Sequence, residues 1–231
     1  MQLLRSILIR HRVWADVRLD VDIPSPTKSP GRALNWEEQG RLLTACAKSR
    51  CRFLYTMIVL AVTTGLRYSE LCSLRWEQID FKRRTLTVGD TKTEAGSGRE
   101  VPLNMRAMQV LEHWSANLDC RPEHAVFFYG QDPMRTVSNI KHGWKTAQHV
   151  ANVECRFHDL RHTACTRMLE AGVPLSVVGD LLGWTAATMY AMAKRYGHIG
   201  SSARVQAVAA LEGSDAGFGW VQNGYKLKME R

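Results

Sequence analysis

The chain has 231 residues, of which 45% are hydrophobic and 23% charged, and its formal net charge is +9 at pH 7. This is the composition of a globular protein. It excludes a chain that crosses a bilayer, because no stretch approaches the roughly 18 consecutive apolar residues that a membrane-spanning helix needs. A positive balance of this size favours a polyanionic partner: DNA, RNA or an anionic membrane surface.

Neither a leader nor a metal site is predicted. Residues 1–13 contain apolar positions, but Arg5 and Arg10 interrupt them and no small-residue cleavage site follows, so no secretory signal is expected. The six cysteines include no Cys-x-x-Cys pair and no zinc-type histidine spacing, which predicts reduced, mostly buried thiols in the cytoplasm. These cysteines are Cys46, Cys51, Cys72, Cys120, Cys155 and Cys165.

The first third of the chain predicts a linker followed by three helices. Residues 23–32 are rich in Pro, Ser and Gly, which is typical of a linker. A helix begins after Asn35, whose side chain can cap it, and Glu38 stands three residues on in the capping-box position. Two further helices are expected over residues 52–62 and 69–74.

After these helices the apolar residues recur at every second position, which is the spacing of a β-strand, and this predicts a β-hairpin. Apolar positions alternate over residues 85–88 and again over residues 99–103, with a Gly/Ser turn at 94–98 between them. Pro102 has no N–H to give to a strand ladder, so the second strand should lie at an edge. The apolar run at residues 126–128 is a candidate for one more strand.

The remaining elements are predicted to be helices. Apolar residues recur at helical spacing over residues 108–118 and 140–151. The last third is helical throughout, and three of its helices are expected to end at or near glycines. The expected ranges are 159–171, 176–182, 186–195 and 201–212. The predicted fold class is therefore mainly α with a small antiparallel β-sheet (α+β).

Side chains that bind phosphate well are spread along these elements. Arg67 stands in the break between two helices, where a guanidinium and free backbone N–H groups can together hold an oxyanion. Lys92 lies at the approach to the hairpin turn, from which a lysine can project and move. His158 and Arg161 are three residues apart, so on a helix they share a face and can meet one phosphate.

Each of these residues, taken alone, also has a purely structural interpretation. Arg67 can pair with Glu70, and Lys92 can be a solvated turn residue. His158 can cap a helix, and Arg161 can be an ordinary surface charge. The set and its order along the chain carry the functional interpretation, rather than any single member.

Two aromatic residues complete the set. Trp184 follows Leu-Leu-Gly and Tyr196 lies in Arg-Tyr-Gly-His, and residues in such places commonly fill the core or pack at a helix end. Five short sequence motifs occur in a fixed order over residues 32–212. Through these motifs the sequence resembles the tyrosine recombinases, or phage integrases. The motifs are TTGLRYSEL, TKTEAGSGREVPL, HDLRHT, LLGW and KRYGHI.

The resemblance implies a catalytic set of six residues. In this set two arginines bind the scissile phosphate, a hairpin lysine protonates the leaving 5′ oxygen, and a tyrosine is the nucleophile. A histidine and, in some members, a tryptophan hold the phosphate and assist the tyrosine. The matching residues are Arg67, Lys92, His158, Arg161, Trp184 and Tyr196.

Two features depart from the common family pattern. Trp184 can donate from its indole N–H but cannot shuttle a proton. Tyr196 lies 12 positions after Trp184, about one helical turn more than the commonest family spacing, so Tyr190 is an alternative nucleophile. Six positions turn a helix by roughly 600°, so the two tyrosines cannot face one pocket. The motif Arg-Tyr-Gly-His favours Tyr196, and Tyr190 is expected to pack.

The function that the resemblance implies is that of a site-specific DNA recombinase (integrase), working through a 3′-phosphotyrosyl intermediate without a metal or other cofactor. The expected partners are double-stranded DNA and further copies of the chain, as a tetramer on DNA. The expected place is the cytoplasm, at the nucleoid of a bacterial or phage-infected cell. Two alternatives stay open: a truncated DNA-binding protein that does not recombine, and a type IB topoisomerase-like enzyme that relaxes DNA.

Three segments are expected in the domain organisation. Residues 1–31 would be the last helix of a core-binding domain and its linker, and residues 32–212 the catalytic domain. Residues 213–231 would be a tail that is flexible or docks on a neighbouring protomer. Because only about 30 residues precede the matching segment, we expect a fragment or a naturally shortened copy.

Overall fold

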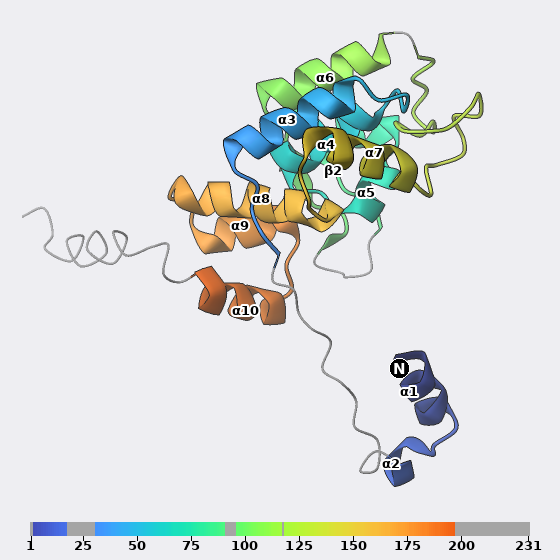
Figure 1. Ribbon diagram of the computed structural model, residues 1–231, viewed down its shortest axis with the longest axis vertical. Coiled ribbons are helices and arrows are strands. Elements are labelled where there is room, and N and C mark those ends of the chain that lie inside the picture. The colour runs from blue at the N-terminus through green and yellow to red at the C-terminus, as the bar shows by residue number, and fades with distance from the viewer. Residues whose placement is uncertain (1, 18–30, 91–95, 117, 197–231) are drawn as a thin grey trace, which may run out of the picture. The chain divides into compact units, whose positions relative to one another are not determined.

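A computed structural model of the chain describes residues 2–17, 31–90, 96–116 and 118–196, and the structural statements below concern these residues (Figure 1). The chain divides into two compact units, Met1–Gly31 and Arg32–Arg231. The first unit holds two short helices, α1 (Gln2–Arg10) and α2 (Trp14–Val17). All other elements belong to the second unit.

The second unit begins with the predicted capped helix, α3 (Trp36–Ala47). The Asn35 side chain accepts a hydrogen bond from the Glu38 backbone N–H at 2.8 Å, and the Glu38 carboxylate accepts one from the Asn35 N–H at 3.0 Å. This reciprocal pair satisfies two N–H groups at the helix start and confirms the expected capping box.

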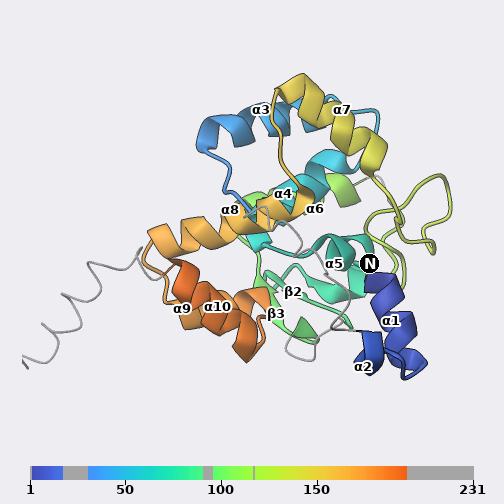
Figure 2. The same ribbon diagram turned by 60° about the horizontal axis from the view of Figure 1, so that its bottom comes forward.

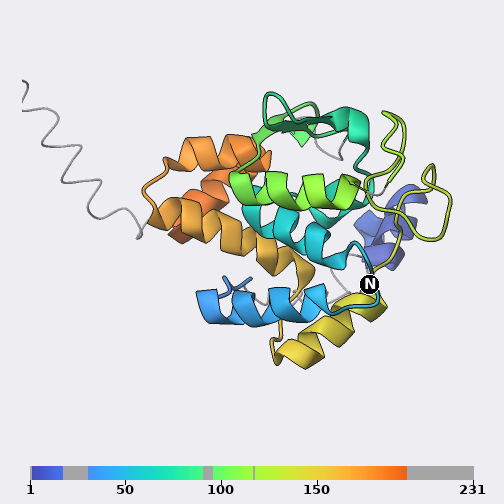
Figure 3. The ribbon, with the colours of Figure 1, turned by 90° about the horizontal axis from the view of Figure 1, so that it is seen from above.

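The core is organised around α4 (Leu54–Thr64), an apolar helix with buried residues on all its faces. A helix of this composition belongs in the interior. It packs against α3, α6 (Met105–Ser115) and α8 (Phe157–Glu170), as Figures 1 and 3 show. It ends at Gly65, whose φ of 67° is in the left-handed region, and α5 (Tyr68–Cys72) follows almost at once. The chain therefore turns sharply at Arg67, beside the core.

The predicted hairpin is part of a three-stranded antiparallel sheet. β2 (Thr85–Thr87) pairs with β3 (Glu100–Pro102), with Leu86 opposite Val101, and β3 lies at the edge as Pro102 indicated. The strand on the other side, β1 (Ile79–Asp80), was not predicted, because two residues are too short to show a period. It follows the short 3₁₀ helix η1 (Trp76–Gln78).

The expected extra strand at residues 126–128 was wrong. Its neighbour Ala125 makes only an isolated bridge with Arg75, and Val126 and Phe127 are buried core residues. The carbonyl of Val126 accepts a hydrogen bond from the Trp114 indole N–H at 2.7 Å instead of extending a ladder. Val126 and Phe127 therefore pack in the core without forming a strand of a sheet.

A second, small apolar cluster lies among the helices at the C-terminal end of the described residues. α7 (Lys141–Ala151) packs on α3, while α9 (Leu175–Leu182) packs against both α8 and α10 (Ala186–Tyr196), as Figure 2 shows. Cys165, Val178 and Leu182 form the cluster, and Trp184 packs on it. α9 ends at Gly183, which has φ 60°.

Several expectations fall on residues that the structure does not describe. They are the linker before residue 31, the first part of the hairpin turn, the helix at 201–212 and the tail at 213–231. Within the described ranges no helix is long and apolar enough to cross a membrane. All six cysteines are free thiols; three are buried, two half-buried and Cys120 exposed.

Candidate functional site

Three arginines from distant segments meet at the C-terminal end of α9. The Arg99 Nε donates to the carbonyl of Leu181 at 3.0 Å, and the Arg67 Nη2 donates to the carbonyl of Gly183 at 2.9 Å. Between them, the Arg161 Nη2 donates to the carbonyl of Leu182. These carbonyls have no partner within the helix, and the helix dipole makes this end negative, so it attracts cations. The end of α9 thus gathers Arg67, Arg99 and Arg161, which we call the arginine cluster.

One buried carboxylate, Glu70, joins two of these arginines. Its Oε1 accepts from Arg67 Nη1 at 2.6 Å, and its Oε2 accepts from Arg99 Nη2 at 2.8 Å. Burial opposes ionisation of Glu70, but the hydrogen bonds from Arg99 and Arg67 outweigh it and lower the pKa of the carboxyl. The structural interpretation of Arg67 as a partner of Glu70 is therefore correct, although it accounts for only part of the Arg67 contacts.

Arg161 on α8 is the most deeply placed member of the cluster. The residue is 5% exposed, and its Nη1 donates to the Gly65 carbonyl at 2.8 Å. Burial and the nearby charge of Arg67 lower its pKa to about 9, so the guanidinium still carries its proton at neutral pH. Arg161 is thus not the surface charge that its structural interpretation expected.

The cluster carries an excess of positive charge. Among the described residues, it holds three guanidinium groups and one carboxylate, and Arg161 forms no ion pair. Burying a charge without a counter-ion is costly, and an anionic ligand would offset that cost. The arrangement therefore suits an anion with several oxygens, such as a phosphate diester.

Two histidines on α8 lie beside this cluster. The rings of His158 and His162 contact each other edge to face, with centroids 4.9 Å apart. His158 is not the helix cap, because Arg156 and Asp159 form the capping box of α8. Desolvation, followed by the charge of Arg161, lowers the pKa of His158. A neutral imidazole at this place can both accept and donate a proton at pH 7.

His162 should make stability sensitive to acid. Desolvation, His158 and Arg195 lower its pKa to about 4, and Asp159 only partly opposes them. Below about pH 6.5 the His162 imidazole is protonated in the unfolded chain but stays neutral in the folded chain. The free energy of unfolding therefore falls as the pH drops from 6.5 towards 4. We expect a loss of about 1–2 kcal/mol between pH 7 and 5, measured by urea unfolding.

The matched variants for this measurement are His162→Gln and His142→Gln. The first should remove the part of the loss that His162 causes, while His158 keeps its own part, and the second, at an exposed position of α7, should leave the loss unchanged. An identical pH dependence in wild type and His162→Gln would show that another group is responsible.

Trp184 directly follows the glycine that ends α9. Its side chain is half-buried on the Cys165–Val178–Leu182 cluster, and its backbone N–H donates to the Gly179 carbonyl at 2.9 Å. The interpretation of Trp184 as a core residue is thus correct for the part of its ring that packs on this cluster. The neighbouring Gly183 carbonyl is the one that Arg67 binds, so Trp184 stands next to the arginine cluster in the chain.

α10 carries both candidate tyrosines. Tyr190 is 77% exposed, so the expectation that it packs was wrong. Tyr196 is the last residue of the helix, and the structure does not describe its side chain. Arg195, next to it, acts electrostatically on His162 of α8. Lys92 lies outside the described residues.

Comparison with known proteins decides the family. A sequence profile of the phage integrase family matches residues 32–201. The chain belongs to the phage integrase family. The integrase of Salmonella phage P22 is 30% identical over 192 residues, covering 78% of this chain and 46% of that protein. The shufflon-specific DNA recombinase of Escherichia coli is 32% identical over 203 residues, covering 85% and 49%.

The fold of this phage integrase family member agrees with a solved relative. The catalytic domain of bacteriophage HP1 integrase superposes with a TM-score of 0.59 at 23% identity, covering 78% of this chain and 95% of that domain. The predicted resemblance and fold class are therefore confirmed. The chain spans about half the length of the two curated relatives described above.

Sequence reasoning on this integrase-family chain missed two polar residues of the site. Arg99 and His162 were not singled out, although both stand inside motifs that carried the resemblance, GSGREVPL and HDLRHT. Glu70 was considered only as a partner of Arg67, whereas it binds two arginines. The hairpin, α5 and α9 meet only in the folded chain. No local sequence pattern shows this meeting.

Gly183 should be required for the close approach of Arg99. A Cβ at this position would lie 2.9 Å from the Cα of Gly96 and 3.0 Å from Arg99 Nη1, in a backbone with φ 60°. We expect Gly183→Ala to lower the free energy of unfolding by about 1–2 kcal/mol for the backbone alone, with a further loss from the collision. Gly172→Ala is the control, because Gly172 has φ 80° and open space around it. Equal losses in the two variants would contradict the contact.

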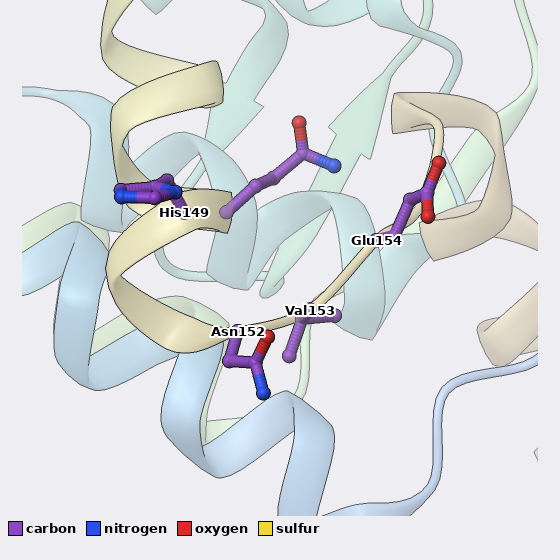
Figure 4. A pocket seen from close by; sticks show the side chains of 5 residues that line it. His149, Asn152, Val153 and Glu154 are labelled. Atoms are coloured by element: carbon purple, nitrogen blue, oxygen red, sulfur yellow. The ribbon is translucent and has the colours of Figure 1, made fainter.

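A separate hollow lies at the C-terminal end of α7. It has a volume of about 260 Å³ and is lined by Gln148, His149, Asn152, Val153 and Glu154 (Figure 4). Asn152 turns the chain there with φ 49°. None of the arginine-cluster residues lines this hollow, so it is distinct from the candidate site.

Proposed function

We propose that the chain is the catalytic part of a site-specific DNA recombinase that cleaves and rejoins DNA through a 3′-phosphotyrosyl intermediate. The observation that carries this proposal is the buried arginine cluster, whose positive charge exceeds its single carboxylate among the described residues. Membership of the phage integrase family and the net charge of +9 support a DNA substrate. The Escherichia coli relative is named a DNA recombinase, which agrees with this chemistry.

In the proposed reaction, Arg67 and Arg161 bind the two non-bridging oxygens of the scissile phosphate. Their guanidinium groups stabilise the charge that builds up in the pentacovalent transition state. Each keeps N–H groups beyond those that bind carbonyls, because a guanidinium has five. The α9 carbonyls fix the direction of both side chains before DNA arrives.

Tyr196 is the proposed nucleophile. Its phenolic oxygen forms a bond to phosphorus while the bond from phosphorus to the 5′ oxygen breaks, and the energy of the diester stays in the new link. A tyrosine has a pKa near 10, so a base must take its proton. His158, neutral at pH 7 because of its lowered pKa, suits this role, and the Trp184 indole N–H would hold the phosphate. Lys92 would protonate the departing 5′ oxygen.

Rejoining reverses these steps with a 5′-hydroxyl from another strand as the attacking group. An exchange of strands needs several active sites at once, so the proposed assembly is a tetramer on double-stranded DNA. Residues 32–212 would form the catalytic domain, and residues 1–31 the end of a core-binding domain and its linker. The proposed place of action is the nucleoid in the cytoplasm.

The test is covalent trapping from a randomised pool of nicked duplexes. A nick just beyond the cleavage site releases the short fragment that carries the new 5′-hydroxyl, so the 3′-phosphotyrosyl adduct cannot religate and can be seen on a denaturing gel. We expect an adduct enriched for one sequence, which then serves as the defined substrate. Binding without any adduct would favour the non-recombining DNA-binding protein, and relaxation of supercoiled plasmid without strand exchange would favour the topoisomerase-like enzyme.

A further inference from the structure

We infer that Arg99 is a positioning residue that keeps the charge of Arg67 available to the phosphate. The inference rests on the proposed function and extends it to a residue outside the proposed catalytic set. Arg99 does not need to touch DNA for this role. It acts through Glu70 and through the end of α9.

The contacts of Arg99 connect three parts of the fold. Its Nη1 and Nη2 donate to the two carboxylate oxygens of Glu70 at 3.2 and 2.8 Å. Its Nε binds the Leu181 carbonyl at 3.0 Å, and Nη1 also binds the Gly96 carbonyl at 2.7 Å. The side chain is only 8% exposed. Arg99 thus ties the hairpin to α5 and to α9 with a geometry that a lysine cannot reproduce.

The charges around Glu70 explain why this matters for Arg67. Glu70 with Arg67 alone would be a neutral pair, and the carboxylate would cancel much of the field that Arg67 exerts on a phosphate. Arg99 supplies a second positive charge to the same carboxylate, so the three groups together carry one net positive charge. Because the site is buried, this difference is only weakly screened by solvent.

Arg99 also fixes the base of the hairpin turn. It precedes β3, and its carbonyl accepts from the Val88 N–H at 2.9 Å, across the ladder from β2. In the sequence, Lys92 lies between these two anchor points. The contacts of Arg99 with Gly96 and Leu181 therefore attach the described end of the hairpin turn, at Gly96, to the same helix end that holds Arg67 and Arg161.

The experiment compares single-turnover cleavage and DNA affinity of the full chain on the defined nicked duplex. Arg99→Gln should slow cleavage by about 100-fold at saturating DNA, with the dissociation constant changed less than about threefold, because the electrostatic effect is on the transition state. Arg83→Gln is the matched control, since Arg83, in the turn between β1 and β2, forms an exposed ion pair with Glu100 on the same sheet. It should leave both quantities unchanged.

A second substitution separates the charge effect from a loss of structure. If Arg99 offsets the charge of Glu70, then adding Glu70→Gln to Arg99→Gln should restore cleavage by about tenfold, because the uncompensated carboxylate is removed. A residue that only stabilised the fold would give the opposite sign, since a second buried substitution weakens the site further. Unchanged cleavage in Arg99→Gln, or further loss in the double variant, would overturn the inference. Absence of an adduct with the wild-type chain would instead overturn the proposed function.

Discussion

Tyr196→Phe should abolish the covalent protein–DNA adduct while leaving DNA binding nearly unchanged. The substitution removes only the phenolic oxygen that forms the proposed bond to phosphorus, so the proposed link cannot form. Binding depends on phosphate contacts by basic residues, which the variant keeps. The measurement is adduct formation on a denaturing gel and, in parallel, a dissociation constant from a gel shift or anisotropy titration at one salt concentration.

Tyr190→Phe is the matched control for this prediction. Tyr190 lies on the same helix, α10, and is 77% exposed, so it is accessible enough to be a rival nucleophile. It should form the adduct at the wild-type rate. An adduct that persists in Tyr196→Phe and disappears in Tyr190→Phe would transfer the nucleophile to position 190.

Arg161→Lys should slow cleavage by about 10²–10³-fold, the usual cost of removing one transition-state donor. The guanidinium of Arg161 binds the carbonyls of Gly65 and Leu182 together, and a lysine cannot span both while also reaching a phosphate. Loss of one buried carbonyl partner should also cost about 1–3 kcal/mol of stability. Single-turnover cleavage on the defined substrate and urea unfolding measure the two effects separately.

The control for Arg161→Lys lies six residues further along α8, at Arg167. Arg167 binds the Leu34 carbonyl and Gln39, and its guanidinium lies over the Trp36 ring at 3.5 Å. It is a structural arginine outside the cluster, so Arg167→Lys should lower stability with cleavage almost unchanged. Cleavage by Arg161→Lys within about threefold of wild type would argue against a phosphate-binding role for this residue.

Much of the architecture could be predicted because its signals are local. The capping box at Asn35 and Glu38 fixes the start of α3, and the glycines at positions 65 and 183 fix the ends of α4 and α9. Pro102 indicated an edge strand for the simple reason that it has no N–H to donate. These features depend on neighbours within a few residues, so the sequence contains them in full.

Other features could not be predicted because they depend on distant contacts. The apolar run at 126–128 has the pattern of a strand, but the Trp114 indole occupies the Val126 carbonyl and the run becomes core packing. Tyr190 was expected to pack from its place in a helix, yet the side of α10 on which it lies is not covered by any described element. Burial of a given helix face is decided by which element lies opposite, and periodicity alone does not name that element.

The sequence by itself determined the family, the fold class and the choice of residues proposed to act on phosphate. Five short sequence motifs in a fixed order were sufficient to identify the family and its fold, because each motif is a local pattern of side chains. Only the tertiary structure decided that Arg67, Arg99 and Arg161 bind three successive carbonyls at the end of α9 and that Glu70 is shared by two of them. The physical reason is that a helix end and a buried carboxylate attract cations through space, from segments that lie up to 116 residues apart in the chain.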